Sequence, residues 1–488
     1  MGMTEPDKTA VIDVGSNSVR LVVYFGAKRA PLQFFNEKVV CGLGRGLAES
    51  GILNPEGRVR ALSAIQRFVG IAERMGVKTI HSVATAAVRD AKDGANFCDE
   101  VFLETNLRLR VVTGAQEATL SAQGVFFCRP DAEGLVCDVG GSSVELAKIG
   151  AGMVDMAQTS ELGPLHLQRF EADKTALNKE IKKQLTLLTK SFKSQETLYL
   201  IGGTIRSFAS LDIARKNYPL SVVNEYTLKI DAFRDLLNWI VTAQDEDIMS
   251  FGAVSSDRLK YFPLVAQVML GLLDKIKPKR IVFSSFGIRE GVLYDNMPAR
   301  FQRRDPLIAA CQFFEASDAR FAEFGTTLYA WVLPLFGTVS EQRKRLIWAA
   351  CLLHDVTWKV HPDYRAEISF GYPTRANLVG LDHQERIFLA VALIHRYRNK
   401  PNVDKLEELN VLLSDEDKAQ AEVLGRAMRL GAMLGGPDVS HMGRLKIAGS
   451  KIELLIDKQS EGLMGEMVER RLGSLAKIMD KVALLRVE

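Results

Sequence analysis

Two short segments carry aspartate, glycine and serine at matching positions. Residues 11–21 read VIDVGSNSVRL and residues 136–146 read VCDVGGSSVEL, so seven of eleven positions are identical without gaps. In each copy an apolar strand ends in aspartate, and the following Gly/Ser turn offers backbone N–H groups and hydroxyls that suit phosphate oxygens. A plain pair of β-hairpins is the alternative interpretation. We expect phosphate contacts from Ser16, Asn17, Ser18, Gly140, Gly141, Ser142 and Ser143.

The aspartates before the two turns, Asp13 and Asp138, can each hold a divalent cation or a water bound to it. The copies differ at an informative position, where the first has Arg20 and the second has Glu145. Glu145 follows Asp138 by seven residues and a turn, so we expect both carboxylates to approach one cleft. Arg20 is interpreted as a structural ion-pair partner. The repeat therefore predicts two similar half-domains that face each other across an asymmetric phosphate clamp.

Glu117 and Arg89 are further candidates. Glu117 lies in the first turn of a predicted helix that directly follows a strand, and ligand groups converge at such junctions in α/β domains. A glutamate in a first turn can also merely complement the helix dipole, and spacing leaves this alternative open. Arg89 follows another strand and can bind phosphate as a planar fork, although a surface arginine fits the pattern equally. The loops at 202–206 and 284–291 are either phosphate contacts or simple helix N-termini.

These side chains must be positioned by the strands and helices that alternate along the first 300 residues, and this alternation predicts an α/β fold. Strands are expected at Thr79–Ala84, Leu107–Thr113, Thr197–Ile201 and Arg280–Ser284, and helices at Ser63–Met75, Ala115–Phe127 and Lys174–Ser191.

The second part of the chain has a different character. Residues 305–440 are helical in period, whereas the tail contains a hairpin signal in which Arg444–Ile447 and Lys451–Ile456 flank a turn. A helix over Leu463–Asp480 and a strand over Val482–Val487 are expected after it. We therefore predict domains at 1–129, 130–300, 301–440 and 441–488.

Composition limits the classes of protein that fit. A chain of 488 residues is too long for one core, and its 47% apolar and 25% charged residues are ordinary for a globular protein. The net charge of +4 is too weak to indicate nucleic-acid binding, and no apolar run is long enough for a membrane span. The six scattered cysteines are expected to be buried free thiols, which fits a cytoplasmic protein without a signal peptide.

Taken together, these motifs resemble the exopolyphosphatase/guanosine pentaphosphatase (Ppx/GppA) family. The resemblance rests on the two Asp/Gly/Ser loops, on 114–120 (GAQEATL), on 84–89 (ATAAVR) and on 202–204 and 285–291, which occur in the family's order over residues 9–295. It implies two actin or sugar-kinase-type half-domains of RNase H-like topology facing a cleft. It also implies that Glu117 is the general base, that Asp138, Glu145 and Asp13 hold Mg²⁺, and that Arg89 and the loops bind the terminal phosphates. A monovalent cation such as K⁺ is also compatible with the family.

The helical region resembles the HD phosphohydrolase-like domain of long family members through His354-Asp355. A working HD site needs another histidine on an earlier helix, and the chain has none between His166 and His354, so a helical scaffold is favoured over a metal centre. Basic clusters at 303–304, 343–345 and 396–400 are either solvated helix faces or a path for a long polyanion.

The sequence thus predicts a processive, Mg²⁺-dependent exopolyphosphatase acting on inorganic polyphosphate, a homodimer with no membrane or nucleic-acid partner. Hydrolysis of pppGpp to ppGpp is the first alternative, because the motifs do not separate the two substrates. A kinase of the same superfold and a nucleotide-binding regulator without turnover belong to other classes. The presence of Glu117 argues against a pure regulator, which would retain the loops and lose the base.

Overall fold

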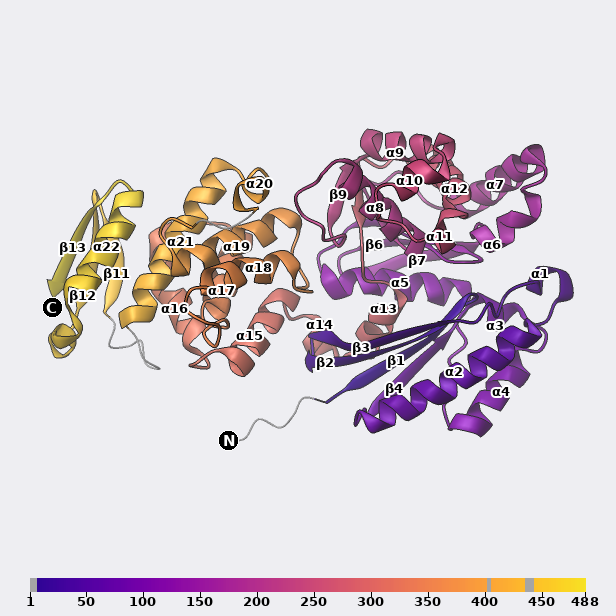
Figure 1. Cartoon of the computed structure of the whole chain (residues 1–488), viewed down its shortest axis with the longest axis horizontal. Coiled ribbons are helices and arrows are strands. Elements are labelled where there is room, and N and C mark those ends of the chain that lie inside the picture. The colour runs from indigo at the N-terminus through magenta and orange to yellow at the C-terminus, as the bar shows by residue number, and fades with distance from the viewer. Residues whose placement is uncertain (1–6, 402–404, 435–442) are drawn as a thin grey trace. The chain divides into compact units, whose positions relative to one another are not determined.

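Residues 7–401, 405–434 and 443–488 are described by a computed structural model, in which the chain forms two compact units, Met1–Arg304 and Asp305–Glu488 (Figure 1). The predicted boundary at residue 440 lies outside the described residues.

The first sheet of the N-terminal unit has four strands in the order β3-β2-β1-β4. β1 pairs antiparallel with β2 and parallel with β4. Helix α2 begins earlier than expected, because Asn54 accepts a hydrogen bond from the Gly57 N–H and Pro55 occupies the first helical position. Apolar residues of α2 and α4 form a core with β1 and β2. The elements are β1 (Thr9–Val14), β2 (Ser18–Ala27), β3 (Ala30–Val40), α1 (Leu47–Ser50), α2 (Pro55–Arg74), β4 (Thr79–Ala84), α3 (Ala86–Asp90) and α4 (Gly94–Thr105).

The second sheet has six strands in the order β7-β6-β5-β8-β10-β9. Its buried strands pack against α7, α8, α9 and α12 in a second core. The elements are α5 (Gly114–Cys128), β5 (Gly134–Val139), β6 (Val144–Gly150), β7 (Met153–Ser160), α6 (Pro164–Leu167), η1 (Gln168–Phe170), α7 (Lys174–Thr189), β8 (Thr197–Ile201), α8 (Gly203–Arg215), β9 (Tyr226–Lys229), α9 (Ile230–Thr242), α10 (Asp245–Met249), α11 (Ser256–Leu259), α12 (Phe262–Ile276), β10 (Arg280–Phe283), α13 (Ile288–Asp295) and α14 (Ala299–Gln302).

The repeat extends beyond the two loops. Strands β1, β2 and β3 with β4 have the same order and directions as β5, β6 and β7 with β8. The strand expected at Leu107–Thr113 was wrong: Val111 makes a single parallel bridge to Ala84. The Ser82 hydroxyl donates to the Arg108 carbonyl oxygen and accepts from the Arg110 N–H, so a side chain replaces the main-chain ladder there.

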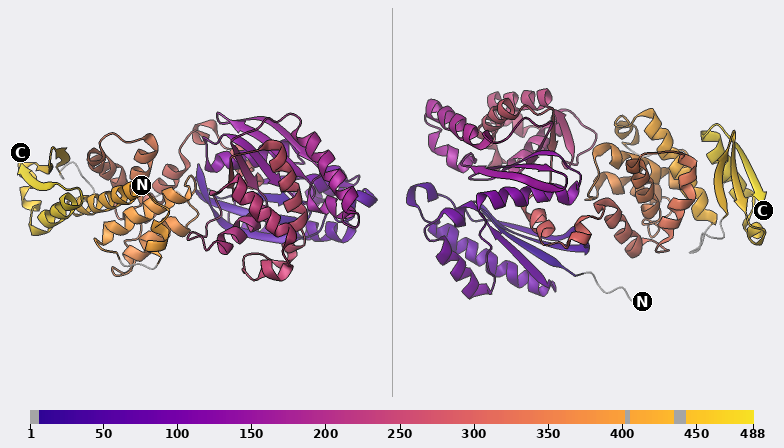
Figure 2. Two further views of the ribbon diagram at one scale, coloured as in Figure 1. Left: turned by 90° about the horizontal axis from the view of Figure 1, so that it is seen from above. Right: turned by 180° about the vertical axis from the view of Figure 1, so that it is seen from behind.

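Helices α5 and α13 cross between the two sheets, as Figures 1 and 2 show. α5 packs against β5, β6 and β7, whereas α13 contacts β1. The two backbones approach so closely that a Cβ on Gly291 would lie 1.7 Å from the Leu120 carbonyl oxygen, and one on Gly124 would lie 2.3 Å from that of Gly287. Glycine at this crossing therefore sets the spacing of the two half-domains.

The second unit is helical and ends in a small α+β subdomain, as predicted. Strand β11 pairs antiparallel with β12, and β12 pairs parallel with β13. The elements are α15 (Pro306–Asp318), α16 (Phe324–Val332), η2 (Leu333–Phe336), α17 (Glu341–Leu353), α18 (Arg365–Arg375), α19 (His383–Tyr397), α20 (Leu406–Asn410), α21 (Asp415–Leu434), β11 (Arg444–Ala448), β12 (Lys451–Ile456), η3 (Lys458–Leu463), α22 (Glu466–Ile478) and β13 (Val482–Val487).

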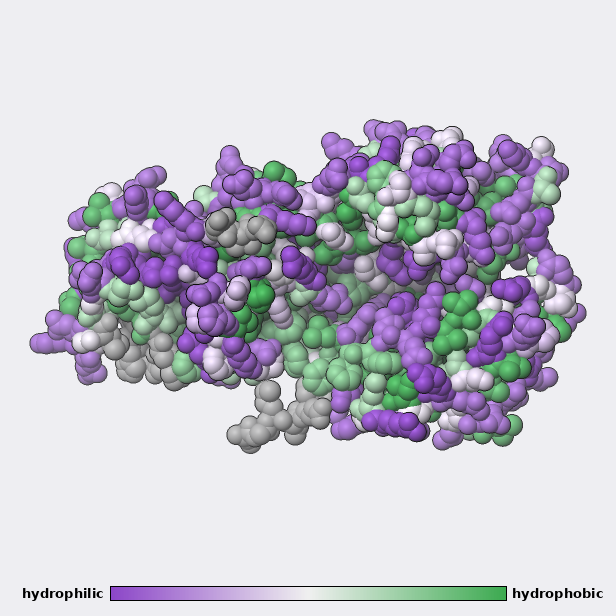
Figure 3. Space-filling view, in the orientation of Figure 1, coloured by the Kyte–Doolittle hydropathy of each residue, from purple (hydrophilic) through white to green (hydrophobic). Residues whose placement is uncertain are grey.

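The polarity of the surface and the state of the cysteines agree with what the composition predicts. On the face in Figure 3, hydrophilic residues are interspersed with small hydrophobic patches. Among the described residues no helix is both long and apolar enough to cross a membrane. All six cysteines are free, and all are buried except Cys98, which is half-buried.

Replacing Gly291 by alanine tests the helix crossing. The new methyl group would meet main chain of α5, so we expect Gly291→Ala to lower the free energy of unfolding by about 1–3 kcal/mol or more. Urea denaturation measures the change. Gly70→Ala in α2 is the matched control, because nothing lies within 4 Å of its added Cβ and alanine favours helix by about 1 kcal/mol. Equal effects of the two substitutions would contradict the tight crossing.

Candidate functional site

The two Gly/Ser loops have the same turn and face each other. The Gly15 N–H donates to the Ser18 carbonyl oxygen at 3.0 Å, and the Gly140 N–H donates to that of Ser143 at 3.0 Å. A Cβ on Gly141 would lie 4.0 Å from the Cβ of Ser16, so the loops oppose each other. The two turns therefore face each other, and phosphate binding between them stays a prediction.

The difference between the copies lies at equivalent register positions. Asp13 pairs across the strands with Arg20, and Asp138 pairs with Glu145. Glu145 is almost fully buried and accepts a hydrogen bond from the Thr159 hydroxyl at 3.0 Å. Arg20 donates to the Asn36 side chain at 2.8 Å, so the interaction that holds it is not the ion pair we expected.

Glu117 lies in the first turn of α5, as predicted, beside Arg89. The Arg89 guanidinium donates to the Glu117 carboxylate at 3.1 Å and to Asp90 at 2.9 Å. A capping box formed by Thr113 and Gln116 fixes the start of α5. The first turn can approach β7 because residue 114 is glycine: a Cβ there would lie 2.1 Å from the Thr159 methyl group. Glu117 is thereby brought close to Glu145, which accepts a hydrogen bond from the hydroxyl of the same Thr159.

The carboxyl groups of the cleft share one electrostatic environment. Burial, opposed by Arg89, raises the pKa of Glu117 from 4.5 to about 7. Burial, with the charges of Glu117 and Asp138, raises the pKa of Glu145 well above its ordinary value. The pKa values of Asp138 and Asp13 are raised mainly by burial as well. Such a group of carboxyls is suited to proton transfer near neutral pH and to cations.

Asp13 and Asp138 each accept a hydrogen bond from a side chain on a helix. The Ser121 hydroxyl, one helical turn after Glu117, donates to Asp138 at 2.5 Å. Arg289 donates to Asp13 at 3.2 Å. Helix α5 therefore carries both the candidate base and the hydroxyl that orients the Asp138 carboxylate.

Basic side chains from both half-domains interact across the same site. Arg20 and Lys38 are cross-strand neighbours in the first sheet. Burial and the guanidinium groups of the second half-domain lower the pKa of both side chains. Burial, together with Arg289 and Arg258, lowers the pKa of Arg206 to about 10. Arg206 lies in the first turn of α8 and Arg289 in the first turn of α13, so both segments that the sequence left ambiguous are helix N-termini that carry a cation. No sequence motif indicated Lys38 or Arg258. A cluster of mutually repelling cations favours a multiply charged anion.

The segment 284–291 is explained by packing. Glu290 is buried, accepts from the Tyr24 hydroxyl at 2.6 Å and from the Gly287 N–H at 3.0 Å, and so joins the start of α13 to β2. Burial would lower the pKa of Arg289, but Glu290 and Asp13 raise it above its ordinary value. Arg289 therefore stays charged at the cleft.

Among the described residues, no three Asp, Glu, His or Cys side chains come close enough to hold a metal by themselves. Mg²⁺ is usually bound by one or two carboxylates, with water and substrate phosphates as its other ligands. The cross-strand pair Asp138 and Glu145 fits this requirement. Asp13 is already paired with Arg289.

The helical unit does not arrange His354 and Asp355 as ligands. The buried His354 ring makes a 2.6 Å hydrogen bond through Nδ1 with the Cys351 carbonyl oxygen, and burial lowers its pKa to about 4. Asp355 forms a bidentate pair with Arg320 at 2.7 Å. These contacts agree with the preferred scaffold interpretation. The basic segment 343–345 is equally engaged, because Arg343 pairs with Asp417 and Arg345 with Asp305, so it is not the free cationic face required for a polyanion path.

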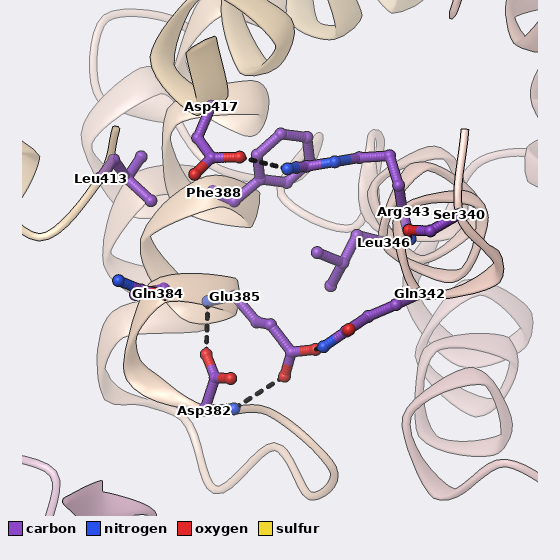
Figure 4. Close-up of a pocket in the computed structure, with 10 residues that line it drawn as sticks. All are labelled: Ser340, Gln342, Arg343, Leu346, Asp382, Gln384, Glu385, Phe388, Leu413 and Asp417. Atoms are coloured by element: carbon purple, nitrogen blue, oxygen red, sulfur yellow. Dashed lines mark hydrogen bonds and ion pairs between the residues drawn. The ribbon is translucent and has the colours of Figure 1, made fainter. Parts of the chain in front are cut away.

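A cavity of about 180 Å³ lies in the helical unit, where the first turns of α17, α19 and α21 meet (Figure 4). The Arg343 guanidinium covers the Phe388 ring there, and Glu385 and Asp382 close a capping box. The cavity contains none of the predicted site residues.

Two protein-family profiles match most of the chain. The sequence profile of the Ppx/GppA phosphatase family matches residues 22–300, and that of the exopolyphosphatase C-terminal domain matches residues 307–485. The chain belongs to the Ppx/GppA phosphatase family. The structure of an exopolyphosphatase from Cytophaga hutchinsonii is similar to the first unit's fold, with a TM-score of 0.55 and 24% identity over 60% of this chain and 98% of that one. The first unit therefore shares the fold of that exopolyphosphatase, and its two repeated sheets agree with the actin and sugar-kinase type expected from the resemblance.

Relatives in this family differ in what their names describe. Retrograde regulation protein 2 of Saccharomyces cerevisiae is 25% identical over 400 residues, 74% of this chain, and the chain spans 66% of that protein. Guanosine-5'-triphosphate,3'-diphosphate pyrophosphatase of Pseudoalteromonas atlantica is 23% identical over 81% of this chain and 80% of that protein. Exopolyphosphatase 1 of Mycobacterium tuberculosis is 24% identical over 59% of this chain and 87% of that protein.

Glu117→Gln tests the electrostatics of the site without a substrate. Because the folded-state pKa of Glu117 is raised, its charge opposes folding above pH 7, and this cost disappears as the pH falls below the unfolded value near 4.5. We expect Glu117→Gln to raise the free energy of unfolding at pH 8, by on the order of 3 kcal/mol at most, and to have little effect at pH 4.5. Urea denaturation at both pH values measures this. An equal effect at the two values would contradict the raised pKa.

Proposed function

We propose that the chain is an exopolyphosphatase that removes terminal phosphate from inorganic polyphosphate with Mg²⁺ and a glutamate base. The observation that carries the proposal is the position of Glu117, whose pKa of about 7 suits a general base at neutral pH, beside Arg89 and close to the carboxylates of the second loop. Hydrolysis of a phosphoanhydride needs a positioned water and charge neutralisation, with little covalent chemistry by the protein.

The residues have complementary roles in this proposal. The N–H groups and hydroxyls of the two opposed loops bind the terminal phosphate, and Arg89 contacts its oxygens as a fork. Glu117 orients the attacking water and accepts its proton. A phosphate that draws the Arg89 guanidinium away from Glu117 also weakens the interaction that lowers the base's pKa. Glu117 would therefore act as the base only while Arg89 contacts both its carboxylate and the phosphate, since loss of Arg89 favours the protonated form.

The carboxylates of Asp138 and Glu145 would hold Mg²⁺, with Ser121 and Thr159 orienting them through hydrogen bonds. When bound, the ion would neutralise charge on the phosphate oxygens. The cationic group Arg20, Lys38, Arg206, Arg258 and Arg289 would attract the remaining phosphates of the chain.

Hydrolysis of pppGpp is the second candidate, since its phosphates would meet the same loops and a relative is named for this activity. A regulator without turnover is the third candidate function, because the yeast relative is named as a regulation protein. The ion pair between Glu117 and Arg89 favours an enzyme over such a regulator. A homodimer in the cytoplasm, with a helical HD-like domain that binds no metal, completes the proposal.

Phosphate release from long polyphosphate, pppGpp and ATP, with and without EDTA, tests the assignment. We expect Mg²⁺-dependent release, fastest from polyphosphate, with kcat/KM rising with pH through about 7 as Glu117 ionises. Glu117→Gln should lose at least about 10²-fold in turnover, the usual scale for removal of a general base. Faster turnover of pppGpp would favour the second candidate, and unchanged turnover in the variant would exclude the mechanism.

Ser121→Ala tests how Asp138 is positioned, and Ser121→Thr keeps a hydroxyl at the same place. Loss of the 2.5 Å hydrogen bond leaves the Asp138 carboxylate less well oriented, so we expect Ser121→Ala to need a higher Mg²⁺ concentration for half-maximal activity. Ser121→Thr should recover most of the loss. An equal loss in both variants, with unchanged Mg²⁺ dependence, would indicate a packing role alone.

A further inference from the structure

Two further segments of the first unit contact the main chain of the Gly/Ser loops. Residues 41–44 follow β3 and residues 161–165 follow β7, so each segment comes directly after the third strand of its half-domain. We call them the first and the second backing segment. They contain none of the residues that the resemblance implies for catalysis or phosphate binding.

The first backing segment donates to two carbonyl groups of the first loop. The Gly44 N–H donates to the Ser16 carbonyl oxygen at 2.7 Å. The N–H groups of Cys41 and Gly42 both donate to the Asn17 carbonyl oxygen, each at 2.9 Å. Both residues of the turn therefore have their carbonyl groups held on the side of the backing segment.

The second backing segment repeats this interaction. The Leu165 N–H donates to the Gly141 carbonyl oxygen at 2.9 Å, and the Gly163 N–H donates to that of Ser142 at 3.2 Å. In the gapless alignment of the repeat, these two carbonyl groups correspond to the two that are held in the first loop. The same main-chain contact is thus formed twice, although the two backing segments differ in sequence.

A carbonyl group held in this way also fixes the N–H group of its own peptide unit. These peptide bonds are trans, so the N–H points opposite to the C=O. The N–H groups of Asn17, Ser142 and Ser143 therefore point away from the backing segments, and within the described part of the chain none of the three has an acceptor. A carbonyl group that accepts a hydrogen bond also makes the N–H of its unit a stronger donor.

Glycine allows the backing segments to reach the loops. A Cβ on Gly163 would lie 2.2 Å from the Ser142 carbonyl carbon and 2.4 Å from the Ser143 nitrogen. A Cβ on Gly44 would lie 3.1 Å from the Cβ of Ser16, a closer contact than usual that a small shift relieves. The second contact therefore excludes any side chain, whereas the first tolerates one with a slight displacement.

We propose that the two backing segments position the loop N–H groups for a bound phosphate chain and thereby set its affinity. The inference rests on the proposed function, because that function assigns phosphate to the loops. Donors that are already oriented bind an anion without a further cost of ordering them, and hydrogen bonds to an anion are stronger than those to a neutral acceptor. Gly44 and Gly163 are positioning residues, because they act through the loops and do not touch the phosphate.

Isothermal titration calorimetry with tripolyphosphate tests the inference in the full-length Glu117→Gln protein, the parent, in which turnover is suppressed. We expect Gly163→Ala to weaken binding by at least about tenfold, the scale of one lost hydrogen bond to a charged group, and Gly44→Ala to weaken it less. Gly150→Ala is the matched control and should bind like the parent, because nothing lies within 4 Å of its added Cβ.

Hydrogen exchange separates positioning from a general loss of stability. Tripolyphosphate should slow exchange of the parent in peptides that cover residues 14–20 and 139–145. Gly163→Ala should lose this protection in the second loop alone, and Gly44→Ala should reduce it in the first loop alone. Gly44→Ala carries the test if Gly163→Ala does not fold. Equal protection in all variants, or equal loss in both loops together with a lower Tm, would overturn the proposal.

Kinetics of the variants with Glu117 intact complete the test. KM for polyphosphate should rise in Gly163→Ala while the pH dependence of kcat stays that of the wild type, because the surroundings of Glu117 are unchanged. Tripolyphosphate that is bound as expected but not hydrolysed by the wild type would contradict the proposed function and support the backing role. Absence of binding to the parent would overturn the backing role, whereas phosphate release by the wild type would still support the proposed function.

Discussion

The close contact between α5 and α13 is the constraint on which the site depends. Leu120 and Gly291 approach through their backbones, and this distance is possible because a side chain is missing on one helix. α5 brings Glu117 and Ser121 to the second loop, while α13 brings Arg289 to the first. Groups from both half-domains are therefore brought together because the two helices carry glycine where they cross between the sheets.

The two Gly/Ser loops differ in the charged groups that surround them. Acidic groups cluster around the Asp138 loop, where the charge of Glu117 raises the pKa of Glu145, whereas Arg20 stands at the equivalent position beside the Asp13 loop. The two loops of the repeat therefore have different electrostatic surroundings. In the proposed function, the surroundings of the Asp138 loop would serve proton transfer and a metal, and those of the Asp13 loop would bind the charge of a phosphate chain.

Local chemistry was predictable from the sequence, and long-range contacts were not. The loops, their strands and the position of Glu117 follow from short motifs with a definite period and turn chemistry. The strand expected at Leu107–Thr113 is reduced to a single bridge at Val111, and the Ser82 hydroxyl, distant in sequence, makes the bonds to the main chain of Arg108 and Arg110. Lys38 and Arg258 reach the cleft through packing, and no residue pattern around them signals this. The same holds for the ion pairs of segment 343–345.

The ion pair between Arg89 and Glu117 joins elements that pack on different sheets. Arg89 lies on the short helix after β4, and α5 rests against β5, β6 and β7. Arg89 opposes the raised pKa of Glu117, so a movement that lengthened this pair alone would favour the protonated form of Glu117 at neutral pH. In the proposed mechanism, the pair would therefore couple the ionisation of the base to the distance between the two half-domains.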